Sequence, residues 1–319
     1  MSYQPLFDPD TAVPFDPERA YRLGDRAEAS EQDRYEYDDR IVLAVNVALA
    51  AGRPLLVRGE PGTGKSSLAC SVARRLGWRF YAATVSSRTT ARDLLWTFDS
   101  VARLADAQAR RTRPRLAYIT PGPLWWAFNP ASAHHRGVAD DRWDKAVARG
   151  VTPAVDPAAP VTHERAVVLV DEIDKADPDV PNDLLVPLGS FTFTLDDGPT
   201  VVAAAAPLVV LTTNEERDLP RAFLRRCVVL ALEDPDTDRL RRIALRHFPD
   251  LDGTSLLDGV LAEYTRVREE RQKAFEQPPG VAELLDALAA CRNLRTGPTT
   301  GDWPGLVELL LAKPGGMRE

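Results

Sequence analysis

The stretch that decides the fold is PLLVRGEPGTGKSSLACSVARRL, residues 54–76. It opens with a short uninterrupted apolar run at 54–57, which is typical of a strand buried on both faces of a parallel sheet. The turn at 59–66 fits the pattern G-x-x-x-x-G-K-[ST], and apolar residues then recur at helical spacing as far as Leu76. The order strand, glycine-rich loop and helix predicts a loop whose backbone N–H groups surround phosphate oxygens.

The side chains at the end of this loop predict a nucleoside triphosphate with Mg²⁺. Lys65 is expected to reach the β and γ phosphates, and the Ser66 hydroxyl is expected to bind Mg²⁺. The alternative is a glycine-rich turn with an incidental lysine. We favour a nucleoside triphosphate and Mg²⁺ as the ligands because the full motif stands in its required context. The residues expected to bind them here are Gly59, Glu60, Pro61, Gly62, Thr63, Gly64, Lys65, Ser66 and Ser67.

Further along the chain, apolar runs alternate with helical patterns. A helix is predicted from Tyr37 to Gly52, and four more runs predict strands at 80–85, 166–170, 208–211 and 228–232. Buried strands that alternate with helices predict an α/β fold, an αβα sandwich with a central parallel sheet. Two polar–apolar alternations around Asp196-Asp197-Gly198 predict a β-hairpin.

Polar residues follow the third and fourth of these strands. Asp171 and Glu172 come directly after Val170, at the carboxyl end of a strand, where open α/β sheets bind ligands. Asp171 is therefore expected to hold Mg²⁺ through water, and Glu172 to act as the general base for an attacking water. Asn214 follows the next strand and is expected to orient that water.

Two adjacent arginines, Arg225 and Arg226, precede the last strand. Arginine is the residue that neutralises phosphoryl charge in the transition state when a neighbouring subunit supplies it. The pair is thus a candidate for that role, and a solvated or salt-bridged surface pair is the alternative.

The character of the sequence changes after Glu233. The remaining apolar residues all follow helical spacing, which predicts a small all-helical lid domain over 234–319 after an αβα domain over 37–233. Residues 1–36 are rich in Pro, Asp and Arg and are expected to form an extended N-terminal arm. The Pro- and Ala-rich stretch at 129–165 is expected to be a surface insertion.

Composition favours a globular protein of the cytoplasm. Of the 319 residues, 44% are hydrophobic and 27% are charged, as in ordinary soluble domains. The longest apolar stretch, 201–211, is shorter than the ~20 residues a membrane helix needs, so no membrane span is expected. The three cysteines are far apart and predict reduced thiols. A net charge of −7 disfavours a nucleic-acid partner, although the basic run at 110–115 leaves a local contact open.

The motifs together resemble AAA+ ATPases (P-loop NTPases), and within them the MoxR-type group, over roughly residues 37–290. The resemblance rests on GEPGTGKSS (59–67), TTARDLLW (89–96), YITPGPLWWAF (118–128), VVLVDEIDKADPDVPNDLL (167–185), LVVLTTNEERDLP (208–220) and AFLRRC (222–227). It implies ATP hydrolysis in a homo-oligomeric ring, usually a hexamer, whose active site is completed by the neighbouring subunit. It also implies chaperone-like remodelling of a client, often beside a partner with a von Willebrand factor A domain.

The resemblance also implies roles for single residues. Asp171 and Glu172 correspond to the Walker B pair, and Asn214 to the first sensor. Arg226, just before the strand, matches the arginine finger, with Arg225 as the alternative. MoxR-type proteins often carry a lid arginine that contacts the γ-phosphate, but the corresponding stretch at 278–285 has no basic residue. The second sensor is therefore in doubt.

Two alternatives to a protein-remodelling motor stay open. One is an AAA+ subunit of a nucleic-acid-directed restriction or anti-phage system, and the other is a weakly hydrolysing nucleotide-gated scaffold. Three aromatic residues also have two interpretations, since they fit either a ring pore that grips a client or the hydrophobic core. They are Trp125, Trp126 and Phe128.

Overall fold

The computed structural model describes residues 4–11, 34–111, 113–138, 164–196, 198–274, 276–298, 300 and 302–311. These residues fold as two compact units. The first unit contains 37–58 and 69–230 together with the N-terminal residues up to 33. The second contains 34–36, 59–68 and 231–319. The phosphate loop predicted at 59–66 therefore groups with the C-terminal helices.

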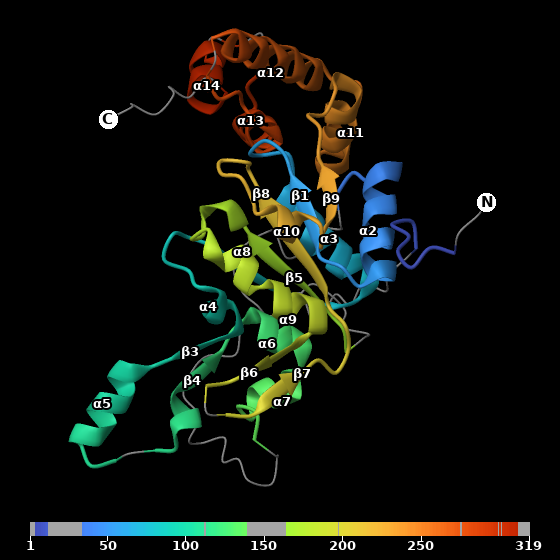
Figure 1. Ribbon diagram of the computed structural model, residues 1–319. Coiled ribbons are helices and arrows are strands. Elements are labelled where there is room, and N and C mark those ends of the chain that lie inside the picture. Colours follow the sequence, from blue (N-terminus) through green and yellow to red (C-terminus); the bar gives the residue numbers. More distant parts are fainter. Residues whose placement is uncertain are drawn as a thin grey trace. The chain divides into compact units, whose positions relative to one another are not determined.

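The centre of the first unit is a five-stranded sheet in the order β2-β5-β8-β1-β9 (Figure 1). Its strands are β1 (Leu55–Arg58), β2 (Arg79–Thr84), β5 (Ala166–Asp171), β8 (Leu208–Thr213) and β9 (Val228–Ala231). The pairs β2–β5, β5–β8 and β1–β8 are parallel. Every residue of β8 is buried, as an uninterrupted apolar run predicts. The predicted strands and the α/β fold class are confirmed.

The first unit also contains helices and short 3₁₀ turns. They are α2 (Asp39–Ala51), α3 (Lys65–Leu76, whose first turn belongs to the second unit), α4 (Ala91–Leu95), α5 (Ser100–Gln108), α6 (Pro123–Phe128), α7 (Pro130–His134), α8 (Asp179–Asp183), α9 (Leu185–Ser190) and α10 (Arg221–Leu224), with 3₁₀ turns η1 (Arg115–Tyr118) and η4 (Ile173–Lys175). Helix α6 packs on β2 and β5, and α2 packs on β1. Helix α2 ends at Gly52, as predicted, and this glycine has a left-handed φ of 60°.

Two small antiparallel sheets complete the first unit. The strands β6 (Thr192–Thr194) and β7 (Thr200–Val202) form the predicted hairpin. The strands β3 (Trp96–Phe98) and β4 (Ile119–Pro121) form a second ribbon, and α5 lies at its end (Figure 1). This ribbon was not predicted, because its strands have three residues each and no tight turn joins them.

The aromatic residues of α6 belong to the core. Trp125, Trp126 and Phe128 are all buried in the main cluster of the first unit. The indole N–H of Trp125 donates to Ser132 Oγ at 3.1 Å. The core interpretation of these three residues is therefore confirmed, and the pore interpretation is wrong for the conformation described here.

Two segments predicted to be irregular are packed over part of their length. Phe7 is buried against α2, where the Asn46 side chain accepts from its N–H (2.9 Å) and donates to its C=O (2.8 Å). Residues 130–138 form α7 and a turn, and Arg136 in that turn is buried. Residues 130–138 of the predicted insertion are thus ordered against the first unit, and its residues 139–163 lie outside the described part of the chain.

The second unit is helical apart from the end of β9, within its described residues. Its elements are α11 (Thr237–His247), η5 (Pro249–Leu251), α12 (Ser255–Lys273), α13 (Val281–Leu294) and α14 (Trp303–Leu310). They share a core that includes Tyr264 of α12 and Leu284 of α13. No helix in the described ranges of either unit is long and apolar enough to span a membrane.

Candidate active site

The phosphate loop leaves β1 at Arg58 and enters α3 at Lys65. Gly59 has a φ of 151°, and a Cβ at this position would lie 2.6 Å from the carbonyl oxygen of Leu232. Only glycine fits there, because the positive φ and the neighbouring backbone both exclude a side chain. The loop therefore presents bare backbone, which suits close approach of phosphate oxygens.

Lys65 is placed inside this loop. The side chain is buried, and its Nζ donates to the carbonyl oxygens of Gly59 and Glu60, both at 2.8 Å. Thr63 Oγ1 also donates to the Glu60 carbonyl, at 2.9 Å. The ammonium thus lies within the curl of the loop that a phosphate would enter. The backbone of the loop and the ammonium of Lys65 therefore fit a phosphate group.

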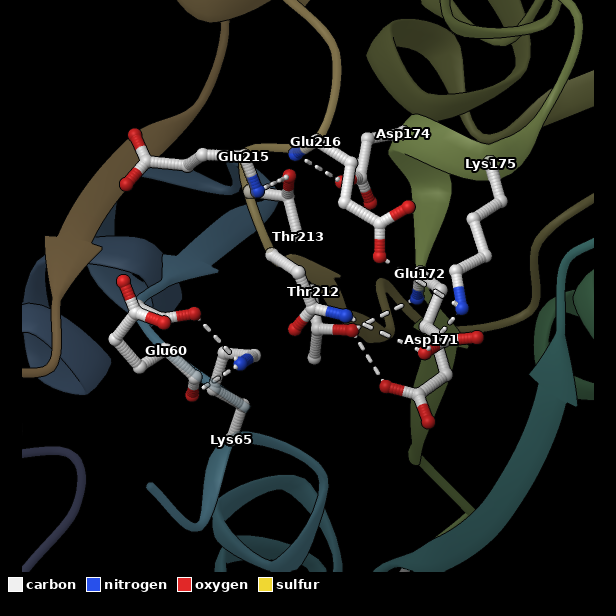
Figure 2. A network of polar contacts seen from close by, with 12 residues as sticks. Glu60, Lys65, Asp171, Glu172, Asp174, Lys175, Thr212, Thr213, Glu215 and Glu216 are labelled. Atoms are coloured by element: carbon white, nitrogen blue, oxygen red, sulfur yellow. Dashed lines mark hydrogen bonds and ion pairs between the residues drawn. The ribbon is translucent and has the colours of Figure 1, made fainter. Parts of the chain in front are cut away.

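The predicted acidic pair lies at the carboxyl edge of the sheet in the first unit. Asp171 is the last residue of β5, Glu172 follows it, and Thr212 of the neighbouring strand β8 joins the two (Figure 2). Thr212 Oγ1 donates to Asp171 Oδ1 at 2.5 Å and accepts from the Glu172 backbone N–H at 2.9 Å. Thr212 is fully buried, so water cannot replace either bond.

Sequence reasoning missed Thr212. The available signal was a polar residue at the end of an otherwise apolar buried strand, LVVLTTN at 208–214. A buried hydroxyl needs hydrogen-bond partners. The partners of this one lie about 40 residues away in the chain, so its role depends on which strands are neighbours.

The Glu172 carboxylate is held by two neighbours. Asn214 Nδ2 donates to Glu172 Oε1 at 3.3 Å, and Lys175 Nζ donates to the same oxygen at 3.0 Å. The hydrogen bond to Glu172 also raises the pKa of Lys175, so this lysine remains charged. The structure therefore brings the predicted base and the predicted first sensor together at the ends of β5 and β8.

Two residues with unusual backbone conformations lie at the same carboxyl ends of the strands. Glu172 and Glu215, which follow β5 and β8, both have a φ of 60°, a left-handed conformation that is unfavourable for residues with a Cβ. The Glu215 N–H donates to Thr213 Oγ1 at 2.9 Å, and the Glu216 N–H donates to buried Asp174 at 3.0 Å. Such strain, held by surrounding bonds, is common at functional sites.

The two predicted arginines lie on the side of the sheet where the parallel strands have their amino ends, opposite to the carboxyl ends that carry Asp171 and Glu172. The Val228 N–H, two residues after Arg226, donates to the carbonyl of Pro54, which directly precedes β1. Through the β1–β8–β5 register, Pro54 is level with Val168 of β5. Glu172 is four residues further on, or about 13 Å along the strand direction. Arg226 therefore lies near the amino ends of the strands, and Glu172 of the same chain lies at their carboxyl ends.

A cavity of about 260 Å³ adjoins Arg226. Its lining includes Leu185, Leu188 and Phe223, with Arg53 and Arg226 as the charged members. Burial raises the pKa of Cys227, another lining residue, to about 12. The thiol therefore has no role as a nucleophile at neutral pH.

Neither of the two arginines that follow the stretch at 278–285, Arg292 and Arg295, lies at the start of α13. Val281 is the first residue of α13, and Arg292 is eleven residues further along the same helix, or about 16 Å. Arg292 also pairs with Asp250, with Nε 2.9 Å from Oδ2. Arg295 caps the other end of α13 in a left-handed conformation. Neither residue can serve at the start of the helix.

A buried strand, a glycine-rich loop and a helix, with an acidic pair after a nearby parallel strand, define a P-loop nucleotide-binding domain. Residues 54–235, more than half of the chain, match the family model described as the AAA domain of the dynein-related subfamily. The chain belongs to this family.

Solved structures with a similar fold are distant in sequence. A putative ATPase from Cytophaga hutchinsonii is 14% identical with a TM-score of 0.42, over 78% of this chain and 66% of that one. The RuvB Holliday junction branch migration motor of Thermotoga maritima is 15% identical with a TM-score of 0.45, over 85% and 67%. No curated protein sequence matches the chain.

Proposed function

We propose that this protein is an ATP-hydrolysing AAA+ motor of the MoxR type, which works as a hexameric ring in the cytoplasm and remodels a partner protein. The family match supports an AAA domain, and the placement of Lys65 in its loop supports nucleotide binding. The MoxR-type assignment and a partner with a von Willebrand factor A domain rest on the sequence motifs alone. The proposed domains are an arm over 1–36, an ATPase domain over 37–233 and a lid over 234–319.

The observation that carries the proposal is the separation of Arg226 from Glu172 across the sheet. The level that Val228 shares with Pro54 lies about 13 Å along the strands from Glu172. Arg226 precedes Val228 by two residues, so we expect that it does not reach a phosphate activated beside Glu172 of its own chain. An arginine finger at the amino ends of the strands has to act on ATP that is bound to a second copy of the chain. The proposed site is therefore incomplete in one chain, which accounts for a ring.

In the proposed reaction, Glu172 accepts a proton from the attacking water, and the Asn214 amide holds that water in line with the γ-phosphate. Mg²⁺, when bound, neutralises charge on the β and γ phosphate oxygens. Ser66 would hold this ion directly and Asp171 through water, while Lys65 would contact the phosphates. Arg226 of the next subunit, or Arg225 in its place, would neutralise charge that develops on the transferred phosphoryl group.

The test is ATP turnover per subunit as a function of protein concentration, with Glu172→Gln as the blank. We expect turnover to rise with concentration and to vanish in the blank, with ATP binding retained. Arg226→Ala should lose turnover and regain part of it when mixed with Lys65→Ala, because each variant then supplies what the other lacks. Turnover that is independent of concentration, with no rescue in mixed rings, would contradict a finger that acts in trans.

A further inference from the structure

The lid contacts the phosphate loop directly through backbone atoms. A Cβ at Gly280, the residue before α13, would lie 2.9 Å from Gly62 Cα and 3.0 Å from the carbonyl oxygen of Pro61. The Val281 N–H, the first of α13, donates to the Gly62 carbonyl at 3.2 Å. All of these residues belong to the second unit. The start of α13 therefore touches the middle of the loop, where a lid arginine was expected from the family pattern.

The residues directly before α13 are also held by hydrogen bonds to other residues of the lid. The carbonyl of Pro279 accepts from the buried Tyr264 hydroxyl and from Arg268 Nη1, each at 2.9 Å. Arg268 is in turn paired with Asp234. The Gly280 N–H donates to the Glu283 carboxylate at 3.1 Å. The contact with the loop thus comes from a segment that the lid itself fixes.

The hydrogen bond from the Val281 N–H constrains both the Gly62 carbonyl and the Thr63 N–H of the loop. The Gly62 carbonyl and the Thr63 N–H share one planar trans peptide and point in opposite directions. The orientation of this peptide depends on ψ of Gly62 and φ of Thr63, and Gly62, whose φ is 80°, restricts ψ less than a residue with a Cβ would. A bond that fixes the carbonyl therefore also fixes the direction of the Thr63 N–H, one of the donors that would face phosphate.

We propose that Gly280 and Val281 are positioning residues, through which the lid sets the orientation of the Gly62–Thr63 peptide and thereby the affinity of the loop for nucleoside triphosphate. This backbone contact would couple the lid to the phosphates in place of a side-chain arginine. The inference rests on the proposed function, because it assumes that the loop binds nucleotide.

The test is Val281→Pro, with Val281→Ala as the matched control. Proline is favoured at the first position of a helix, and Gly280 (φ −92°, ψ −177°) already has the extended conformation that a residue before proline needs. The proline variant therefore loses the N–H and places its Cδ against the Gly62 carbonyl, which breaks the contact while α13 is kept. The alanine variant loses the side chain and keeps the N–H. Affinity for a fluorescent ATP analogue is measured together with the melting temperature.

We expect Val281→Pro to weaken ATP binding about tenfold, or about 1.4 kcal/mol, with the melting temperature close to that of Val281→Ala. The alanine variant should bind within about twofold of wild type. Equal affinity of the two variants would overturn the proposal. Failure of the wild-type protein to bind ATP would instead contradict the proposed function.

If Val281→Pro does not fold, Gly280→Ala serves as the second variant. Its methyl group would press on Gly62 and Pro61, whereas Gly305→Ala, with no atom within 4 Å of the new Cβ, is the control. We expect weaker ATP binding only in the first. Wild-type affinity in Gly280→Ala, with its fold intact, would overturn the proposal as well.

Discussion

Replacement of Thr212 by valine tests whether one buried hydroxyl organises the acidic pair. Valine has nearly the same shape, so the change removes the bond to the Asp171 carboxylate and leaves the Glu172 N–H without its acceptor. A hydrogen bond to a charged group contributes about 1.5–3 kcal/mol, and a buried unsatisfied N–H costs about 1–3 kcal/mol. We therefore expect the free energy of unfolding to fall by about 3 kcal/mol.

The same change should reduce ATP turnover at least tenfold and raise the Mg²⁺ concentration that turnover requires, because the Asp171 carboxylate and the backbone of Glu172 then both lose the hydroxyl that holds them. Urea unfolding measures the stability, and a Mg²⁺ titration of ATPase activity measures the site. The control is Thr213→Val, which removes an equally buried hydroxyl that bonds the Glu215 N–H and neither member of the pair. Equal turnover in the two variants would refute the reasoning, as would a wild-type Mg²⁺ dependence in Thr212→Val.

Three further predictions concern the first unit. Trp125→Ala should lower the free energy of unfolding by about 3–5 kcal/mol, since it opens a cavity in the core; a loss below 1 kcal/mol in urea unfolding would contradict the packing described. Partly exposed Cys70 should react with iodoacetamide well before Cys227, because the Cys227 pKa of about 12 leaves a thiolate fraction of roughly 10⁻⁴ at pH 8. Peptide mass spectrometry gives the order of labelling, and faster labelling of Cys227 would contradict its burial. Asn46→Ala should speed limited proteolysis of the N-terminal segment around Phe7, which that amide holds; an unchanged cleavage rate would show that the amide is not the anchor.

Local features of this protein were predictable from its sequence. The loop at 59–66 could be identified because its glycines, lysine and serine are adjacent in the chain and its chemistry needs them in that order. The strands β5 and β8 could be identified because each begins with the uninterrupted apolar run that is typical of a strand buried on both faces, at 166–170 and 208–211. Asp171, Glu172 and Asn214 followed from these strands, since the carboxyl ends of parallel strands share one edge.

Other features depended on contacts between residues that are distant in the chain. Thr212 bonds the acidic pair because β8 is the neighbour of β5, and Arg226 lies at the far edge because β9 begins beside Pro54. Helical spacing could not distinguish a core from a pore for Trp125, since both give the same periodicity. The sequence alone thus determined the strands of the central sheet, the phosphate loop and the polar residues Asp171, Glu172 and Asn214 that follow the strands. The tertiary structure decided which ends meet, because strand order and the contact of Gly280 with the loop arise only when distant segments pack together.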